Sequence, residues 1–541
     1  MWAWGNVNVG NESDYACGTD IEGFIDYCRT HPSITYFHNL GFDGVFIMDY
    51  LLKHGVTWVK KNPKENEFTT LIDRLGKVYS ITVNLAGSVT EFRDSYKKLP
   101  MRVAEVARAF HQDEGKGEID YGAPRPVGYS PTAEEWDYVR RDVVIVARAL
   151  RETLAEGMTR LTVGSDAMAE YKGLIGGESR FRNFFPALSA DMDDDIRSAY
   201  KGGFTHADRR TAGRIVGKGS VYDVNSLYPY VMHERPLPYG QPTVFAAAPP
   251  DEGLWTATVT FQARLKESHI PCIQVKRNVI FSGTEYLEDI SEPVTVAVSS
   301  VDWALWNDHY DIWGVEWRGG FSYRSRTGMI SSYIDKWMEV KQNSVGGKRA
   351  IAKLFLNSLY GKFAKNTNVT GKRPVLEGDH VALVLNDFEQ CEPAYTPLGI
   401  FVTSWARDYT VRTAQKNYKR FLYADTDSLH VLGREPLIDV DVHPTRLGAW
   451  KHESDFERAI FVRAKQYSEV VDGRPDTHIA GLPRSVAVNI FPEDMLHDCT
   501  WYGKLVPRRV RGGVVLRETT FNFKAVRNDD QEFCESDGAC A

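Results

Sequence analysis

The chain has 541 residues, a formal charge of −7, 43% hydrophobic and 25% charged residues, which is the composition of an ordinary globular protein of about three to four domains. Its seven cysteines contain no C-x-x-C pair, which argues against a disulfide framework or a zinc site and favours a reducing compartment. No apolar run approaches the roughly 18 residues of a membrane span, so we expect a cytoplasmic protein without a membrane partner. A negative total charge does not reveal whether a basic groove for nucleic acid exists.

The first 52 residues predict two strands followed by a helix. Trp2 to Val9 alternates like a strand that begins at once, so we expect that something upstream is missing. Residues 33–38 predict a buried strand, followed by Asn39, Asp43 and an apolar helical run over 45–52. Asp43 then follows a strand end, where a carboxylate either reaches a cleft or caps the helix.

Residues 130–150 predict a long helix. Thr132 and Glu135 form a capping-box pattern at its start. Tyr138 and Asp142 are i,i+4 neighbours, so they share one face. That face is either solvated or functional, and Asp142 borders the apolar stripe.

The middle of the chain contains a linker, an acid and an insertion. Residues 200–204, which include Gly202 and Gly203, are typical of a linker between domains. Asp223 comes near the end of the next strand. Residues 235–328 have the size of an inserted module with short strands over 255–261 and 294–298.

A cationic helix follows at 348–362. At about 100° per residue, Arg349, Lys353, Asn357 and Tyr360 point in one direction, and apolar residues cover the opposite side. This pattern favours a face that binds phosphate and base over a simply solvated one.

The segment 421–432 predicts a hairpin with an acidic bend. Apolar β-forming runs flank Asp425 and Asp427, and carboxylates at i and i+2 of an extended backbone face the same side. The pattern fits either an acidic turn or a Mg²⁺ site, because oxygen ligands suit Mg²⁺.

The C-terminal part contains three further features. Lys465 and Tyr467, at i and i+2 of a predicted strand, would share a face that grips a phosphate and stacks on a sugar or base. A basic run over 504–511 and a small β element follow, and 528–541 is an acidic segment that we expect to be disordered.

These acids and cations together indicate phosphoryl transfer. Asp223 would share two Mg²⁺ ions, about 3.5–4 Å apart, with Asp425 and Asp427, and the helix cations would neutralise a triphosphate. No side-chain nucleophile is needed.

The ordered motifs resemble those of family B DNA polymerases. Asp223-Val-Asn-Ser-Leu-Tyr-Pro, Lys353-Leu-Phe-Leu-Asn-Ser-Leu-Tyr-Gly and Tyr423-Ala-Asp-Thr-Asp-Ser are similar to motifs A, B and C, and Lys465-Gln-Tyr467 is similar to the Lys-x-Tyr motif. The insertions and the Tyr200-Lys-Gly-Gly linker resemble those of the protein-primed bacteriophage polymerases of the phi29 type.

The resemblance implies an α/β and α+β multidomain fold, with a ribonuclease H-like 3′–5′ exonuclease domain and a right-hand polymerase. The expected divisions are an exonuclease-like domain (1–162), palm (163–234 and 393–503), two terminal-protein regions (235–328 and 368–392), fingers (329–367), thumb (504–527) and the acidic tail (528–541).

The resemblance also implies roles for single residues. Asp223, Asp425 and Asp427 would be the catalytic acids and, with the Val224 carbonyl, the metal-binding set for two Mg²⁺ ions, for which Mn²⁺ can substitute. The expected nucleotide-binding residues are Ser226, Leu227, Tyr228, Lys341, Lys353, Asn357 and Tyr360. Tyr423, Lys465, Tyr467, Gly202 and Gly203 would contact the primer or DNA. The implied partners are template-primer DNA, deoxynucleotides and a terminal protein as primer, and we expect a monomer.

The N-terminal part departs from the family pattern. Asn39, Asp43, Lys116, Tyr138 and Asp142 resemble exonuclease residues, with Asp142 a metal ligand, but the first motif, an Asp-x-Glu on an opening strand, has no counterpart. Asp20-Ile-Glu22 has the letters and is interpreted as a helix start instead. We therefore expect weak exonuclease activity, from a start-site truncation or from natural loss.

Other interpretations remain. The chain could be a nucleic-acid-primed family B polymerase or a non-catalytic DNA-binding relic. A reverse transcriptase is disfavoured, because its motif usually pairs adjacent acids and here Thr426 separates them.

Overall fold

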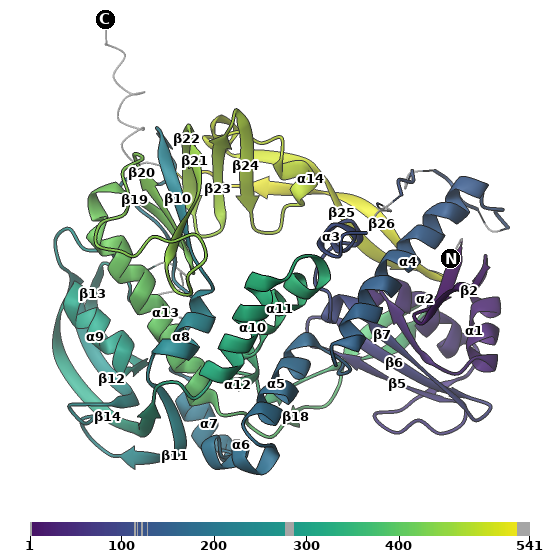
Figure 1. Cartoon of the computed structure of the whole chain (residues 1–541), viewed down its shortest axis with the longest axis horizontal. Coiled ribbons are helices and arrows are strands. Elements are labelled where there is room, and N and C mark those ends of the chain that lie inside the picture. The colour runs from purple at the N-terminus through teal and green to yellow at the C-terminus, as the bar shows by residue number, and fades with distance from the viewer. Residues whose placement is uncertain are drawn as a thin grey trace, which may run out of the picture.

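The computed structural model describes residues 3–112, 115, 117–120, 123–126, 128–275 and 286–526. Lys116 and the predicted acidic segment 528–541 lie outside these residues. Several sheets with helices packed between and around them form the structure (Figure 1), which confirms the predicted multidomain mixture of α/β and α+β units. Within the described part, no helix is long and apolar enough to cross a membrane.

The N-terminal unit is built on a five-stranded sheet in the order β3-β7-β6-β5-β4, in which β3 runs parallel to β7. The unit's core includes Phe24, Phe68 and Phe92. A separate antiparallel hairpin of β1 and β2 packs on α4. The elements are β1 (Trp4–Asn8), β2 (Asn11–Gly18), α1 (Ile21–Thr30), β3 (Ile34–Phe37), α2 (Leu40–Lys53), β4 (Thr57–Trp58), β5 (Glu67–Ile72), β6 (Val78–Leu85), β7 (Ser88–Asp94), η1 (Ser95–Lys97), α3 (Val103–Ala109) and α4 (Ala133–Ala155).

Local sequence signals explain two of these helices. Thr132 and Glu135 form the predicted capping box at the start of α4. Asp20 caps α1 by accepting the backbone N–H of Gly23 at 2.7 Å, which confirms that Asp20 and Glu22 mark a helix start. The predicted buried strand over 33–38 exists as β3, but it lies at the edge of its sheet and Ile34 is exposed.

A second five-stranded sheet, called the central sheet here, has the order β21-β10-β20-β19-β8 and is antiparallel throughout. The largest hydrophobic core lies beside it, around the mostly buried helix α13. Its elements are β8 (Thr205–Ala207), β10 (Gly219–Val224), α8 (Leu227–Glu234), α13 (Thr396–Lys416), η2 (Tyr418–Arg420), β19 (Phe421–Asp425), β20 (Ser428–Leu432) and β21 (Trp450–Phe456). Three helices precede it: α5 (Val163–Leu174), α6 (Glu178–Phe184) and α7 (Ala190–Arg197).

The predicted insertion 235–328 forms a sheet of its own, in the order β11-β14-β12-β13, with α9 beside it. Its elements are β11 (Leu237–Phe245), β12 (Leu254–Leu265), β13 (Asp289–Ser299), α9 (Ser300–His309) and β14 (Tyr310–Arg326). The chain then forms α10 (Ser331–Asn343), α11 (Gly346–Ser358) and α12 (Tyr360–Phe363), which lie between the central sheet and the N-terminal unit (Figure 1).

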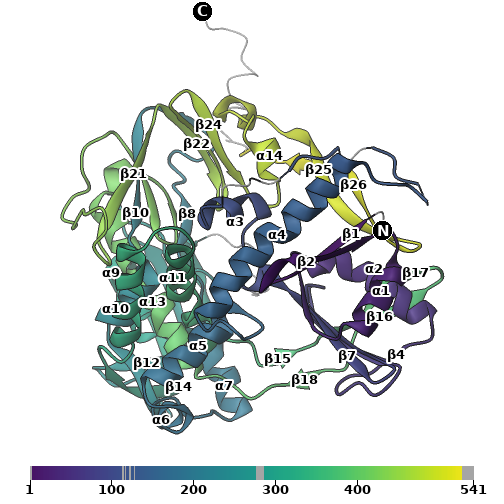
Figure 2. The same ribbon diagram turned by 45° about the vertical axis from the view of Figure 1, so that its right-hand side comes forward.

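The second predicted insertion, 368–392, reaches from the central part of the molecule to the N-terminal unit (Figure 2), where its hairpin packs on α2 and β5. It contains β15 (Asn368–Val369), β16 (Lys372–Glu377), β17 (His380–Leu385) and β18 (Glu389–Gln390).

The C-terminal segments form a four-stranded sheet, β24-β23-β22-β9, and a long hairpin that reaches α2 and β17. Val381 of β17 and Val514 of β26 join the N-terminal core. The elements are β9 (Ile215–Val216), β22 (Arg458–Arg463), β23 (Gln466–Val471), β24 (Arg474–Ile479), α14 (Arg484–Ala487), η3 (Pro492–Met495), β25 (Cys499–Val510) and β26 (Gly513–Phe523). The predicted terminal β element is therefore a hairpin that begins at Cys499.

Candidate active site

Three predicted catalytic acids meet at one end of the central sheet. β10 pairs with β20 and places Asp223 opposite Ser428. Asp425 and Ser428 close the tight turn between β19 and β20, as the hairpin prediction requires. The backbone N–H of Val224 donates to the carbonyl oxygen of Asp427 at 2.8 Å. The fold thus joins acids that are far apart in the sequence.

The pKa values of both Asp223 and Asp427 are raised above the ordinary value of an aspartate. Burial, followed by the charge of Asp427, raises the pKa of Asp223 to about 7. Burial is also the largest cause of the raised pKa of Asp427, to which Asp425 adds. Lys353 opposes the shift at both acids. Both carboxylates therefore lie in a site that favours a compensating positive charge.

The surroundings of this acid pair fit a divalent cation. Among the described residues, neither Asp223 nor Asp427 accepts a hydrogen bond from another side chain, and no group of three or more His, Cys, Asp or Glu is arranged as a metal site. Mg²⁺ usually takes one or two carboxylates and completes its shell with water and substrate phosphates. Two carboxylates without other partners are suitable donors for that arrangement.

Asp425 has different surroundings from Asp427. The ammonium of Lys465 donates to both its oxygens, at 2.8 Å and 2.7 Å, and the hydroxyl of Thr205 donates to Oδ1 at 3.0 Å. The prediction that Asp425 and Asp427 face the same side assumed an extended backbone, and that assumption is wrong because Thr426 has φ +62°. The turn separates the two acids into different environments.

Cations from α10 and α11 lie near the acid pair. Lys341 donates to the hydroxyl of Ser226 at 3.0 Å, and Arg349 donates to the Lys341 backbone carbonyl. Burial, followed by the charges of Arg349 and Lys353, lowers the pKa of Lys341. The structure therefore gathers the predicted Ser226, Lys341 and Lys353, and adds Arg349 from the cationic face.

The predicted helix 348–362 is interrupted. α11 ends at Ser358 and Tyr360 begins α12, so the cationic face does not continue along one helix to Tyr360. The ring of Tyr360 instead lies 4.3 Å from that of Tyr228, centroid to centroid. Asn357 is exposed on α11, whereas the Leu227 side chain is buried in the core and leaves only its backbone for a ligand.

A second group of predicted residues lies beside Asp425. The backbone N–H of Lys465 donates to the hydroxyl of Tyr423 at 2.9 Å, and the Tyr423 and Tyr467 rings are 4.9 Å apart. Lys465 has φ +59° and lies in the turn between β22 and β23, so the prediction that it shares a strand face with Tyr467 is wrong.

These residues still meet, because a cavity of about 280 Å³ is lined by Asp425, Lys465 and Tyr467 together. It is also lined by His478 and Arg484, which the sequence analysis did not identify. The His478 ring stacks on Tyr467 at 4.9 Å. Both missed residues come from β24 and α14, after the Lys-x-Tyr motif, and no spacing rule connects them to it.

The predicted linker packs against the acidic turn. The Thr426 backbone N–H donates to the Phe204 carbonyl at 2.6 Å, and a Cβ at Gly203 would lie 2.5 Å from Thr426 Oγ1. Only glycine fits at position 203 without displacement of the turn. Arg407 of α13, also missed from the sequence, donates to the backbone carbonyls of Lys201 and Gly202.

The predicted exonuclease residues occupy two helices of the N-terminal unit. Asn39 precedes α2 and Asp43 lies in its first turn, while Tyr138 and Asp142 lie on α4. Burial, and then the charge of Asp94, raises the pKa of Asp43 to about 7, although its own backbone N–H opposes the shift. Asp94, which the sequence analysis missed, accepts the backbone N–H groups of Asn39 and Tyr96, each at 3.0 Å.

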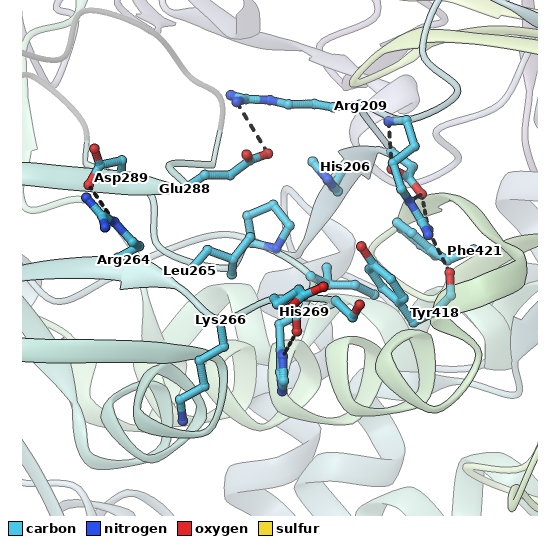
Figure 3. Close-up of a pocket in the computed structure, with 16 residues that line it drawn as sticks. His206, Arg209, Arg264, Leu265, Lys266, His269, Glu288, Asp289, Tyr418 and Phe421 are labelled. Carbon is cyan, nitrogen blue, oxygen red and sulfur yellow. Dashed lines mark hydrogen bonds and ion pairs between the residues drawn. The ribbon is translucent and has the colours of Figure 1, made fainter.

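A further cavity is separate from both acid groups. It has about 620 Å³ and lies between β8, the insertion 235–328 and the start of β19. Figure 3 shows Arg209 with Glu288 and Arg264 with Asp289 as ion pairs at 3.4 Å and 3.8 Å. His206 of β8 also lines it, on the opposite strand face to Thr205. Its charged groups are largely paired with one another, so we assign it no catalytic role.

Comparison with known proteins agrees with this geometry. The family described as DNA polymerase type B, organellar and viral, matches residues 28–130 and 125–436. The DNA polymerase of Bacillus phage M2 is 40% identical over 97% of this chain and 96% of its own length. The DNA polymerase of Bacillus phage phi29 is 38% identical with the same coverage.

The structural comparison gives the same family. A solved structure of phi29 DNA polymerase with primer-template DNA and incoming nucleotide substrates matches with a TM-score of 0.92 and 38% identity, over 97% of this chain and 96% of that one. The chain therefore belongs to the phi29-type bacteriophage DNA polymerases of family B, and it is a DNA-directed DNA polymerase.

Proposed function

We propose that this polymerase extends DNA by nucleotidyl transfer at Asp223 and Asp427, with two Mg²⁺ ions, or Mn²⁺ in their place. Their carboxylates and the Val224 carbonyl would hold the metal, with Asp425 as the companion acid. When bound, the ions would activate the primer hydroxyl and would stabilise the leaving pyrophosphate. The observation that carries the proposal is the half-buried Asp223–Asp427 pair, in which burial and then the charge of Asp427 raise the pKa of Asp223 to about 7.

The surrounding side chains would position the substrates. Lys353 lies close enough to Lys341 that its charge helps to lower the pKa of Lys341, and both lysines would neutralise the triphosphate of the incoming nucleotide. Ser226 and the Leu227 backbone would border that triphosphate. Asn357 and the Tyr360 ring would contact the nascent base pair, and Tyr228 would lie beneath the deoxyribose and exclude a 2′-hydroxyl.

The primer would lie on the side of Asp425 that faces away from the proposed nucleotide site. Lys465 and Tyr467 line the adjacent cavity and would grip the primer end, with Tyr423 holding the Lys465 backbone. The linker glycines 202 and 203 would guide DNA past the acidic turn. Extension then forms a bond from the primer 3′-oxygen to the α-phosphorus and releases pyrophosphate.

Initiation on a terminal protein is the finer part of the proposal. It is supported by the two insertions at 235–328 and 368–392, each of which forms β structure of its own, and by the phi29 relatives. A hydroxyl of the terminal protein would replace the primer hydroxyl in the same chemistry. We propose that the polymerase acts as a monomer in the host cytoplasm, as fits a phage replication enzyme.

Primer extension tests the proposed nucleotidyl transfer, and a priming assay tests initiation on a terminal protein. Purified protein with a DNA primer-template, deoxynucleotides and Mg²⁺ should extend the primer, and a failure would contradict the proposed function. With dATP, Mg²⁺ and a candidate terminal protein, a covalent terminal protein–dAMP product would support protein priming. Extension of DNA primers without that product would favour a nucleic-acid-primed enzyme.

The N-terminal unit would contribute little 3′–5′ exonuclease activity. A two-metal hydrolase needs several carboxylates around its ions. Asp43 has Asp94 as an acidic neighbour, but Asp94 is engaged by two backbone N–H groups and by Lys97 at 3.2 Å. Weak digestion of single-stranded DNA by the protein is the expected result.

A further inference from the structure

Asp425 is held by donors from three separate segments. Lys465 comes from the turn between β22 and β23, Thr205 from β8, and Thr426, whose hydroxyl donates at 3.3 Å, from the acidic turn itself. The Tyr423 hydroxyl is more distant, at 3.5 Å from Oδ2. Of these donors, Thr205 is the one that lies outside every polymerase motif identified in the sequence.

The position of Thr205 is fixed by the sheet. β8 is the edge strand of the central sheet and pairs only with β19 among the described strands, with Thr205 directly opposite Asp425. Side chains of directly opposed residues on neighbouring strands lie on the same face and contact each other. The hydroxyl of Thr205 therefore reaches the carboxylate without a long, flexible side chain.

The segment before Thr205 is also fixed. Phe204 accepts the backbone N–H of Thr426, and Gly203 packs against the Thr426 side chain. Arg407, itself buried and paired with Asp302, holds the carbonyls of Lys201 and Gly202. Thr205 thus joins the immobilised linker to the catalytic turn.

Lys465 alone is a weak anchor for Asp425. Its side chain is 58% exposed, and an ion pair with an exposed lysine contributes little because water competes for both charges. Lys465 also lies near enough to Asp427 to favour the charged form of that acid. If Asp425 rotated away, the ammonium could pair with Asp427 and occupy a carboxylate that the metal requires.

We propose that Thr205 is a positioning residue of the polymerase centre: its hydroxyl fixes the Asp425 carboxylate, which in turn keeps the Lys465 ammonium on the primer side and away from Asp427. The proposal rests on the proposed function, because it assigns Lys465 to the primer end and Asp427 to the metal. Thr205 does not touch the reacting atoms and acts only through Asp425.

The first test compares substitutions that differ in the hydroxyl. Thr205→Val keeps the shape and removes the hydrogen bond, and it should lower kcat for nucleotide addition about tenfold and raise the Mg²⁺ concentration needed for half-maximal rate. Thr205→Ser should restore both values to within about twofold of the parent. Thr90→Val is the matched control, since Thr90 is a buried strand threonine whose hydroxyl donates to the Cys28 carbonyl in the N-terminal unit, and it should leave both values unchanged.

The second test asks whether Thr205 acts through Lys465. A double-mutant cycle with Lys465→Met should show strong non-additivity, with Thr205→Val changing kcat less than about twofold in the Lys465→Met background. Thr205→Ala is run in parallel, so that misfolding of one variant, detected by circular dichroism and thermal unfolding, leaves the cycle complete.

The outcomes separate the two proposals. Inactivity of the parent protein would contradict the proposed function. A parent that extends primers, together with an unaffected Thr205→Val, a Thr205→Ser as slow as Thr205→Val, or additive effects in the cycle, would overturn the role of Thr205 and leave the polymerase assignment in place.

Discussion

The proposed polymerase centre and the N-terminal unit hold acids of the same kind in different settings. Asp223 lies near the end of β10 and Asp427 lies in the turn between β19 and β20, where neighbouring acids add to the negative charge and nearby lysines offset it. Asp43, with a similarly raised pKa of about 7, has as its acidic neighbour an aspartate that binds the backbone. A two-metal site needs several carboxylates that can face the ions, so similar pKa values do not imply similar chemistry.

The largest expected effect is the loss of polymerisation in Asp223→Asn and Asp427→Asn. Each change removes a charge that the metal requires, so nucleotide addition should fall by about 10³-fold or more. Single-turnover primer extension measures this loss. Asp311→Asn, an exposed aspartate on β14, is the control and should match the parent. Near-normal extension by Asp223→Asn would show that the chemistry is elsewhere.

The next effect concerns the junction between the two regions. Lys98, after η1, is fully buried and donates to Asp166 of α5 at 3.0 Å. Lys98→Met leaves Asp166 buried without its cation and should cost about 3–5 kcal/mol of unfolding free energy. Urea denaturation measures this change.

Two further variants check the cause of that change. Adding Asp166→Asn, which can still accept the Arg160 backbone N–H, should recover part of the loss. Lys524→Met, which breaks the exposed pair with Asp498, should cost less than about 1 kcal/mol. Equal losses in Lys98→Met and Lys524→Met would contradict a buried junction.

A smaller effect is a pH-dependent difference between the two regions. An acid whose folded pKa is raised carries no burial penalty below its unfolded pKa, near 4, and a full penalty above its folded pKa, about 7 for Asp223 and Asp43. In metal-free protein, the Tm of Asp223→Asn and that of Asp43→Asn should therefore exceed the Tm of the parent by an amount that grows as the pH rises from 4 to 7. This difference should reach about 1–3 °C.

Mg²⁺ distinguishes the two acids in the same experiment. At pH 7.5 it should raise the Tm of the parent and of Asp43→Asn, but not that of Asp223→Asn, because binding stabilises only the folded state that has the site. Differential scanning fluorimetry across this pH range measures both effects. A Mg²⁺ response that depends on Asp43 would place a metal in the N-terminal unit.

Local patterns predicted much of the fold and several of the residues that meet in the candidate site. The apolar runs around Asp425 and Asp427 predicted the hairpin, and Thr132 with Glu135 predicted the start of α4, because both signals act over a few residues. The positive φ of Thr426 was not predicted, although a two-residue hairpin turn favours it, because a β-branched residue rarely adopts that conformation. The division between α11 and α12 at Leu359 also escaped prediction, since Leu359 keeps helical dihedral angles and no residue type marks it.

The missed residues depend on tertiary pairing. Thr205 meets Asp425 only because β8 pairs with β19, and Arg407 reaches the linker from the middle of a buried helix. His478 joins Tyr467 across the β23–β24 pair. None of these partners has a fixed sequence spacing, so no motif could have identified them.

The central claim is that this chain has a working polymerase centre and an incomplete exonuclease centre, and one assay tests both. An end-labelled primer is incubated with the parent, Asp223→Asn or Asp43→Asn. In one reaction the primer is hybridised to a template and deoxynucleotides are present. In the other reaction it is single-stranded and deoxynucleotides are absent. We expect extension by the parent and by Asp43→Asn, none by Asp223→Asn, and little digestion of the single strand by any of the three. Rapid digestion by the parent that Asp43→Asn abolishes, or extension that survives in Asp223→Asn, would contradict the central claim.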